Sequence, residues 1–443
     1  MHRIRTLAAA PSITAPAGAQ WSRHKTVVVR NRCPSERTIE KADARRCVNA
    51  LQTVDMDIES IVCDPENLYE ASKRVLESGP KKQATAYFKQ KRLAEIRRAQ
   101  DELHSRTWKI KPMRPFMLNE RGHRRKIVGN TPYDRMIIHS YLDFGLEPLL
   151  RKYLIYDNYA SQKGKGTDLA RRKFKEFCHR AYRECGHNRF YVLLIDFAKF
   201  YDNVQHEKLK RAILNKIPYD PFHEYMIDTI LNSMQADVSY MTDEQYAHCL
   251  ETKYSSLDHL DEEVTGKRFM AKGLQIGNQA SQLFSIFYPA SIDTFCRCVM
   301  GARLHGRYMD DTFIVHEDKD FLRRAIAETT KRCEKLGIYV HERKTQIYRI
   351  DKGVKYLNRV YTMSETGKLY ERLHKSTVIR QKRKLRKFKR MLEDGSMTYE
   401  RILNHHRTWM GSFDRAMTRR QKNDICDLYN KLFIDDFAKG GAT

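Results

Sequence analysis

The 443-residue sequence lacks any apolar run that approaches the roughly 20 residues needed to span a bilayer, so we expect no transmembrane helix and no membrane partner. Its ten cysteines include no CxxC pair, and the closest two are Cys296 and Cys298. This pattern excludes a zinc signature and a disulfide framework, and it indicates the reduced thiols of a cytoplasmic protein. The phosphate-binding GxxxxGK[ST] spacing is also missing, because the glycine-rich loop Ser161–Thr167, SQKGKGT, is too short for it.

Acidic residues are scarce relative to basic ones. Asp and Glu number 55 against 82 Lys and Arg, which gives a formal net charge of +27. Such an excess favours a polyanionic partner, and it favours nucleic acid over a membrane surface. Hydrophobic residues make up 41% of the chain, enough for a large core and two or three subdomains.

The N-terminal part of the chain divides into a leader and a helical segment. Residues 1–36 show no periodicity, so we expect a disordered leader. The composition of residues 1–25, basic and free of acidic residues, is also that of an organellar transit peptide, with a flexible leader or a misassigned start codon as alternatives. Helical patterns fill residues 37–83, and Gly79 and Pro80 break the chain.

Two adjacent aspartates, Asp310 and Asp311, lie in the stretch Gly306–Val315, GRYMDDTFIV. The flanking runs, Leu304–Met309 and Thr312–His316, predict strands, so a tight hairpin should carry both carboxylates at its tip. Adjacent carboxylates repel one another, and a divalent cation would stabilise them. An ordinary polar turn is the alternative interpretation.

A third carboxylate follows the run Tyr191–Ile195, YVLLI, which predicts a strand buried on both faces and ends at Asp196. The alternative role for Asp196 is to cap the following helix. If its strand neighbours the hairpin, three carboxylates meet. Such a set can bind two Mg²⁺ ions, the arrangement used for in-line attack of a hydroxyl on a phosphate.

Two basic segments could contact nucleic acid. The predicted hairpin Trp108–Val128 carries a cluster of basic residues, which suits either a triphosphate or a solvated strand edge. A helix capped by Ser376 has one narrow apolar stripe and is basic elsewhere. Because that charge has one sign over several turns, we expect nucleic-acid contact. The residues assigned to this contact are Lys382, Arg383, Arg386, Lys387 and Arg390.

Helices and strands alternate after Tyr191, which favours an α+β fold with a small antiparallel sheet and helices on one face. An acidic stretch at about residues 237–265 interrupts this pattern as an insertion or surface excursion.

The order of these blocks resembles the palm of reverse transcriptases. The matching blocks are Asp196 with Phe200 and Tyr201, GLQIGNQASQ, YMDD, Gly337 with Lys344, and VKYLNRVY. The resemblance covers roughly Arg106 to Trp409. The blocks IGNQASQ and YASQKGKGTDLA are similar to those of bacterial enzymes of the diversity-generating and defence-associated "unknown group" types.

The resemblance implies a right-hand polymerase with a helical N-terminal extension. Its fingers would span residues 84–190, its palm 191–362, and its basic helical thumb and C-terminal tail 370–443. The implied reaction is RNA-directed DNA synthesis, in which a primer 3′-OH attacks the α-phosphate of a dNTP. The implied setting is an anti-phage defence system or a diversity-generating retroelement.

Roles carried over by the resemblance make Asp196 and Asp310 the principal ligands of two Mg²⁺ ions, with Mn²⁺ as an alternative. Asp311 would support them, and the main-chain carbonyl of Phe197 would complete a metal shell. Tyr201 would exclude ribonucleotides by contact with the 2′ carbon. The other implied dNTP contacts are Arg125, Lys126, Gln275, Ile276, Gly277 and Lys344, the last of these near the leaving pyrophosphate.

The implied partners are a cognate structured non-coding RNA as template, a DNA or RNA primer, dNTPs, and an accessory protein or a second copy of the chain. Two rival functions remain open. A template-independent or protein-primed DNA polymerase would use the same palm, and a non-catalytic, maturase-like RNA-binding protein would need only the charge and the thumb.

Overall fold

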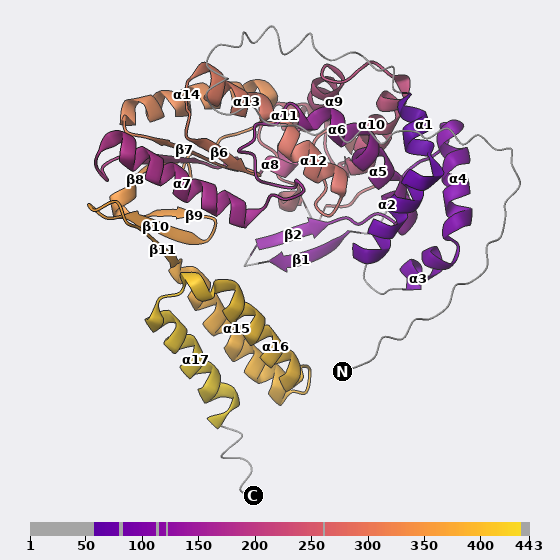
Figure 1. Cartoon of the computed structure of the whole chain (residues 1–443). Coiled ribbons are helices and arrows are strands. Elements are labelled where there is room, and N and C mark those ends of the chain that lie inside the picture. The colour runs from indigo at the N-terminus through magenta and orange to yellow at the C-terminus, as the bar shows by residue number, and fades with distance from the viewer. Residues whose placement is uncertain (1–56, 79–82, 112–114, 121–122, 260–261, 436–443) are drawn as a thin grey trace, which may run out of the picture. The chain divides into compact units, whose positions relative to one another are not determined.

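The computed structural model describes residues 57–78, 83–111, 115–120, 123–259 and 262–435 (Figure 1). The predicted leader, residues 1–36, and the extension up to residue 56 lie outside the described residues. The described residues belong to one compact unit that begins at Asp57. None of the helices in these ranges combines the length and apolar character needed to cross a membrane.

The first described elements are four helices. They are α1 (Ile58–Cys63), α2 (Pro65–Ser78), α3 (Gln83–Gln90) and α4 (Arg92–His104). Asp57 caps α1 through the amide of Glu59, and the Asp64 carboxylate accepts from the first amides of α2. Their apolar stripes, including Ile58 and Leu68, are buried in the largest core cluster.

A basic hairpin follows, as predicted. Strands β1 (Phe116–Glu120) and β2 (His123–Ile127) pair antiparallel. The next elements are α5 (Pro132–Ser140), the π-helix η2 (Tyr141–Leu146), α6 (Glu147–Arg151) and α7 (Thr167–Cys185). Pro132 occupies the first turn of α5 and Thr131 caps it, accepting from the amide of Asp134.

The central sheet is antiparallel with strand order β6-β7-β3-β8. Its strands are β3 (Tyr191–Ile195), β6 (His305–Tyr308), β7 (Asp311–His316) and β8 (Gln346–Arg349). Alternate residues of β3 and β7 pack on opposite sides. Leu193 and Ile314 join the cluster that contains α14 (Lys319–Leu336), and Val192 and Phe313 join the one that contains α7. Helices therefore cover both faces (Figure 1), rather than the single face predicted.

Further helices pack in the largest core cluster. They are α8 (Phe200–Asn203), α9 (His206–Leu214), α10 (Pro221–Met234), α12 (Gln279–Phe287), α13 (Ala290–Thr294) and the π-helix η4 (Phe295–Val299). The acidic stretch has its own small apolar cluster around Val238 and Met270. It contains β4 (Ala236–Asp237), α11 (Asp243–Glu251) and the 3-10 helix η3 (Ser256–His259), and β5 (Phe269–Met270), just beyond it, pairs with β4.

The C-terminal part forms a second sheet and a helical bundle. The sheet has strand order β11-β10-β9 and follows the 3-10 helix η5 (Ile350–Lys352). Its strands are β9 (Val354–Tyr356), β10 (Arg359–Met363) and β11 (Leu369–Leu373). The bundle comprises α15 (Lys375–Glu393), α16 (Tyr399–Phe413), η6 (Asp414–Ala416) and α17 (Arg419–Phe433). Helix α15 begins one residue before the predicted cap Ser376, because the ring of His374 accepts the amide of Ser376 and caps the helix instead.

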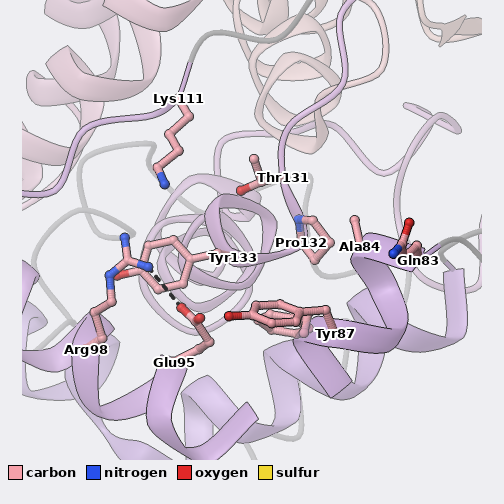
Figure 2. Close-up of a pocket in the computed structure, with 10 residues that line it drawn as sticks. Gln83, Ala84, Tyr87, Glu95, Arg98, Lys111, Thr131, Pro132 and Tyr133 are labelled. Atoms are coloured by element: carbon pink, nitrogen blue, oxygen red, sulfur yellow. Dashed lines mark hydrogen bonds and ion pairs between the residues drawn. The ribbon is translucent and has the colours of Figure 1, made fainter. Parts of the chain in front are cut away.

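A pocket of about 640 Å³ lies beside α3, α4 and the start of α5 (Figure 2). The rings of Tyr87 and Tyr133 line it, and Lys111 and Arg98 bring positive charge to its wall. Arg98 stacks on Tyr133 with its guanidinium carbon 4.2 Å from the ring centroid, and it forms ion pairs with Glu95 and Glu102. The pocket lining includes none of the predicted metal ligands.

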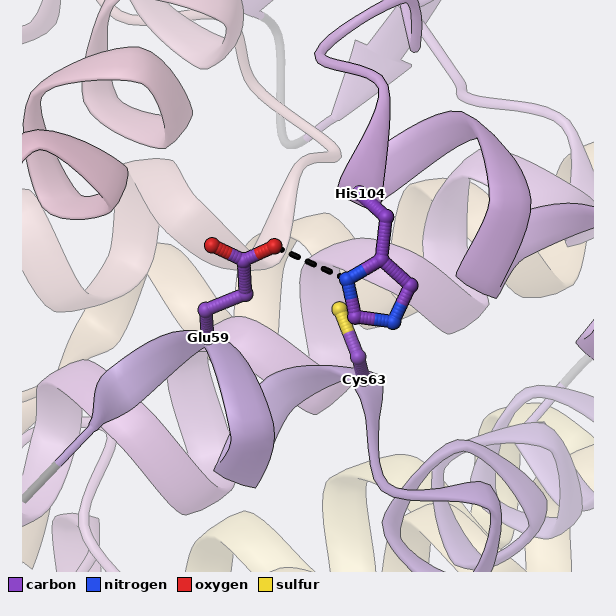
Figure 3. Close-up of side chains that lie close together, drawn as sticks. All are labelled: Glu59, Cys63 and His104. Carbon is purple, nitrogen blue, oxygen red and sulfur yellow. Dashed lines mark hydrogen bonds and ion pairs between the residues drawn. The ribbon is translucent and has the colours of Figure 1, made fainter.

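Glu59, Cys63 and His104 lie close together where α1 meets the end of α4 (Figure 3). His104 Nδ1 is 2.9 Å from Glu59 Oε1, and the other carboxylate oxygen pairs with Arg106. Burial raises the pKa of the Cys63 thiol to about 12, which disfavours the thiolate that a metal would require. Because the Arg106 guanidinium already pairs with the Glu59 carboxylate, we interpret these residues as an ion-pair cluster that joins α1 to the end of α4.

We expect Glu59→Gln to lower the free energy of unfolding by about 1 kcal/mol at pH 7. Hydrogen bonds from Arg106, and then from His104, outweigh burial and lower the pKa of Glu59. A carboxylate with a lowered folded-state pKa contributes stability above its unfolded pKa and loses that contribution as pH falls through the folded value. The difference between wild type and variant, measured by urea unfolding, should therefore shrink below about pH 4.3.

Glu77→Gln is the matched control, because Glu77 is an exposed carboxylate near the end of α2. Equal stability of wild type and Glu59→Gln at pH 7, or a difference in stability that grows in acid, would contradict a stabilising ion-pair cluster at Glu59.

Candidate active site

The aspartate pair lies on the hairpin between β6 and β7. Tyr308 pairs with Asp311, so the two turn residues are Met309 and Asp310, and Asp311 is the first residue of β7. The predicted tip, Asp310 and Asp311, is therefore wrong by one residue. Met309 has φ 56°, the left-handed value that a two-residue hairpin turn requires at its first position. Residues other than glycine rarely adopt it, so this turn stores strain.

The register of β3 against β7 brings Asp196 to this hairpin. Ile195 pairs with Thr312, and one further step along the same antiparallel register places Asp196 opposite Asp311. Directly opposed residues of antiparallel strands project to the same face of the sheet. The strand end and the hairpin therefore present their carboxylates together, as predicted for neighbouring elements.

The three carboxylates repel one another in a partly buried setting. Burial, followed by the charges of Asp310 and Asp196, raises the pKa of Asp311 to about 7. Burial also raises the pKa of Asp310, and the charge of Asp196 adds to this, while Lys344 and Arg125 oppose it. A divalent cation would relieve the repulsion, and an all-oxygen donor set suits Mg²⁺.

Lys344 supplies positive charge to this group. Its Nζ lies 3.1 and 3.3 Å from the two carboxylate oxygens of Asp196. Among the described residues, only the Glu59 set brings three metal-type donors within 4.8 Å of one another, so the aspartates are more widely spaced in this structure. The structure thus places Lys344 beside Asp196, whereas the resemblance assigned it to the leaving pyrophosphate, a role that stays a prediction.

The main chain of Phe197 forms an isolated antiparallel bridge with Val340. The Ala198 amide donates to the Tyr339 carbonyl, and the His341 amide donates to the Asp196 carbonyl. Phe197 and Val340 are therefore a non-hydrogen-bonded antiparallel pair, in which the Phe197 carbonyl turns away from Val340 and toward the β7 side. That orientation suits the metal-shell role predicted for it.

Tyr201 on α8 is held on two sides. Its hydroxyl donates to Ser285 Oγ on α12 at 3.3 Å, and its carbonyl accepts from the amide of Leu274 at 2.7 Å. Burial raises the pKa of Tyr201, the hydrogen bond with Ser285 opposes this, and the nearby charge of Asp310 adds to it. The phenol is therefore neutral at physiological pH and lies near the aspartate hairpin.

The loop that contains Gln275, Ile276 and Gly277 joins β2 to this region. The Val128 amide donates to the Ile276 carbonyl at 3.2 Å. Gly277 has φ 111°, and a Cβ there would lie 3.1 Å from the Val128 carbonyl oxygen. The side-chain amide of Gln275 donates to the Ser233 carbonyl at the end of α10, so this side chain already has a partner within the protein.

The two predicted triphosphate ligands on β2, Arg125 and Lys126, project to different faces of the hairpin. Arg125 lies near enough for its charge to act on both Tyr201 and Asp310. Successive residues of a strand point to opposite faces, so Lys126 projects to the other side of the hairpin. The geometry therefore favours Arg125 over Lys126 at the site.

The five predicted nucleic-acid contacts on α15 have different surroundings, because one is paired within the protein and four are exposed. Lys382 Nζ forms an ion pair with Asp424 on α17 at 2.8 Å, so it helps to pack the bundle. The other four are exposed at helical spacings of three and four residues and form one basic stripe. They are Arg383, Arg386, Lys387 and Arg390.

Sequence reasoning missed three residues near the site: Ser285, Asp293 and Arg307. Arg307 precedes Tyr308 on β6 and is fully buried, and its partner Asp293 is also buried. The available signal was a charged residue in a largely apolar segment for Asp293, and a charged residue inside a predicted strand for Arg307.

Comparison with known proteins gives a family. The family model for "Reverse transcriptase (RNA-dependent DNA polymerase)" matches residues 119–359, which include Asp196, Tyr201, the Gln275–Gly277 loop and the aspartate pair. No curated protein matches the chain significantly. The matched range exceeds half of the 443 residues. The chain therefore belongs to the reverse transcriptase (RNA-dependent DNA polymerase) family.

Proposed function

We propose that this protein is an RNA-directed DNA polymerase that makes cDNA by attack of a primer 3′-OH on the α-phosphate of a dNTP. The supporting observation is the β3–β7 register, which carries Asp196 to the Asp310–Asp311 hairpin. Tyr201 and Arg125 lie near the same carboxylates. A protein that only binds RNA, the maturase-like alternative, has no use for this combination.

Asp196, Asp310 and Asp311, together with the Phe197 carbonyl, would hold two Mg²⁺ ions or, alternatively, Mn²⁺. When bound, such ions stabilise the charge that develops on the transferred phosphate and activate the attacking hydroxyl. The raised pKa of Asp311 and the mutual repulsion of the aspartates support a site built to receive cations.

The surrounding residues would orient the nucleotide. Arg125 would bind the triphosphate, because a guanidinium makes paired hydrogen bonds with phosphate oxygens. The Tyr201 ring, held by Ser285, would occupy the space that a ribose 2′-OH needs. Lys344 would donate hydrogen bonds to the leaving pyrophosphate from its place beside Asp196.

The basic stripe on α15 would contact the phosphate backbone of the primer–template. Arg383, Arg386, Lys387 and Arg390 are exposed. The proposal rests on these four, because Lys382 is paired with Asp424.

We further propose a bacterial, cytoplasmic setting in anti-phage defence or in a diversity-generating retroelement. The support is the sequence likeness of the IGNQASQ and YASQKGKGTDLA blocks. The partners would be a structured non-coding RNA as template, a DNA or RNA primer, and an accessory protein or a second copy of the chain. Extension without any template would favour the template-independent or protein-primed alternative.

The double variant Asp310→Asn, Asp311→Asn should lose primer extension on an RNA template by about a thousandfold, since several kcal/mol of charge stabilisation depend on these ligands. RNA binding should be unchanged. Glu262→Gln with Glu263→Gln is the control, because it removes another adjacent and exposed acidic pair. Undiminished extension by the aspartate variant would end the proposal.

Tyr201→Ala should lower the preference for dNTP over rNTP by about 10- to 100-fold, measured as the ratio of kcat/KM values. Tyr201→Phe keeps the ring and removes only the hydroxyl bonded to Ser285, so it should lose far less of the preference than Tyr201→Ala. A preference unchanged in the alanine variant would rule out the ring as the sugar-selecting group.

Gly277→Ala should raise the KM for dNTP about tenfold, because the new Cβ meets the Val128 carbonyl and the positive φ disfavours alanine. Gly129→Ala, two residues beyond β2, meets nothing within 4 Å and is the control. Equal KM values for Gly277→Ala and wild type would mean that the contact between loop and strand does not shape the nucleotide site.

A further inference from the structure

Arg307 on β6 is fully buried, and its guanidinium bonds to three separate parts of the chain. Nε lies 3.0 and 2.8 Å from the two carboxylate oxygens of Asp293 on α13. Nη1 donates to the Met309 carbonyl at 2.9 Å, and Nη2 donates to the Ile286 carbonyl on α12 at 2.7 Å. A planar fork of fixed geometry thus joins the aspartate turn to two helices.

The bond to Met309 acts on the turn itself. Met309 has the strained positive φ, and its carbonyl belongs to the peptide unit that leads into Asp310. The hydrogen bond from Nη1 holds this carbonyl against the strain. The orientation of Asp310 therefore depends on a buried residue that lies outside the carboxylate group.

The bond to Ile286 reaches the sugar-selecting side of the site. Ile286 follows Ser285, whose hydroxyl accepts the hydrogen bond from Tyr201 and also lies 3.7 Å from the Met309 sulfur. One guanidinium thus bridges the turn that carries Asp310 and the helix that holds Tyr201. The planar guanidinium therefore couples the position of the turn to the position of α12.

Asp293 keeps the guanidinium in place. The titratable groups near Asp293 include Cys296, Cys333 and His305, and the His305 Nε2 lies 3.6 Å from the Asp293 Oδ1. Burial lowers the pKa of His305 to about 4, so the imidazole is neutral at physiological pH and cannot replace the arginine charge. The neighbouring ion pair joins Arg297 and Asp157. It lies along the edge of β6 that does not pair with β7, where the Arg307 main-chain amide donates to the Asp157 carbonyl.

We propose that Arg307 and Asp293 are positioning residues that set the distance between the catalytic aspartate turn and the sugar-selecting Tyr201. This inference rests on the proposed function. Stability alone gives no need for such a pair, because apolar residues often replace a buried ion pair without loss of stability. The pair instead holds in place a turn whose backbone is strained at Met309.

The test compares two variants with wild type in the full chain. Arg307→Leu with Asp293→Leu removes both charges, so that neither is left buried and unpaired. Arg307→Lys keeps the charge opposite Asp293 but loses the fork that reaches Met309 and Ile286. Arg297→Leu with Asp157→Asn is the control, since it removes a neighbouring ion pair that does not hold the turn.

Urea unfolding, kcat and KM for dTTP on an oligo(dT)-primed poly(rA) template, and the dNTP-to-rNTP ratio are measured together. We expect both Arg307 variants to stay folded under assay conditions, with a urea midpoint lowered by the loss of the bonds to Met309 and Ile286, and to lose about 10- to 100-fold in kcat with little change in KM. Their dNTP preference should also fall. Loss of activity in proportion to unfolded protein, with unchanged preference, would reduce the pair to a structural role and overturn the proposal.

Amide hydrogen exchange separates this inference from the proposed function. The segment around Met309–Asp311 should exchange faster in both Arg307 variants than in wild type and the control. If wild type fails to extend primers, the polymerase proposal falls, whereas faster exchange still supports the positioning role of Arg307. Equal exchange in all four proteins would overturn that role whatever the activity.

Discussion

The antiparallel register between β3 and β7 is the constraint on which the rest of the site depends. Because Ile195 opposes Thr312, Asp196 comes opposite Asp311 at the end of the pairing. A slip of one residue would turn every side chain of β3 to the other face. Such a slip is prevented because both faces are buried, one against α14 and its neighbours and the other against α7.

Parts of the chain that are distant in sequence reach this sheet through main-chain contacts. The Leu274 amide bonds the Tyr201 carbonyl, and the Val128 amide bonds the Ile276 carbonyl. One short loop therefore joins the basic hairpin, α8 and α12. Main-chain hydrogen bonds of this kind depend little on side-chain identity, so the loop can keep its position while its side chains bond elsewhere, as the side chain of Gln275 does with the Ser233 carbonyl.

The net charge of +27 is a poor guide to individual contacts. Arg307 is buried with Asp293, and Lys382 is paired with Asp424. Both contribute to the count, yet each is engaged within the protein. The exposed stripe on α15, the surface proposed for nucleic acid, contains far fewer charges than the composition alone indicates.

Local patterns were sufficient to identify the strand YVLLI, the basic hairpin, the aspartate hairpin and the ordered blocks of a polymerase palm. These features depend on residues that are consecutive or nearly so, and apolar periodicity and turn chemistry act over that range. The turn was misplaced by one residue because the backbone of Met309, rather than residue type, decides where the hairpin closes. The sequence pattern also predicted helices on only one face of the central sheet. A strand such as β3 that is buried on both faces needs helices or other elements packed on each of them.

Only the tertiary structure distinguished Arg125 from Lys126 and paired Lys382 with Asp424 in the bundle. Only the tertiary structure brought Arg307 into contact with Asp293, Ile286 and Met309. Each of these outcomes depends on strand facing or on a partner in another element. Such partners meet because burial fixes the register and packing of whole elements, a property that no single stretch of sequence contains.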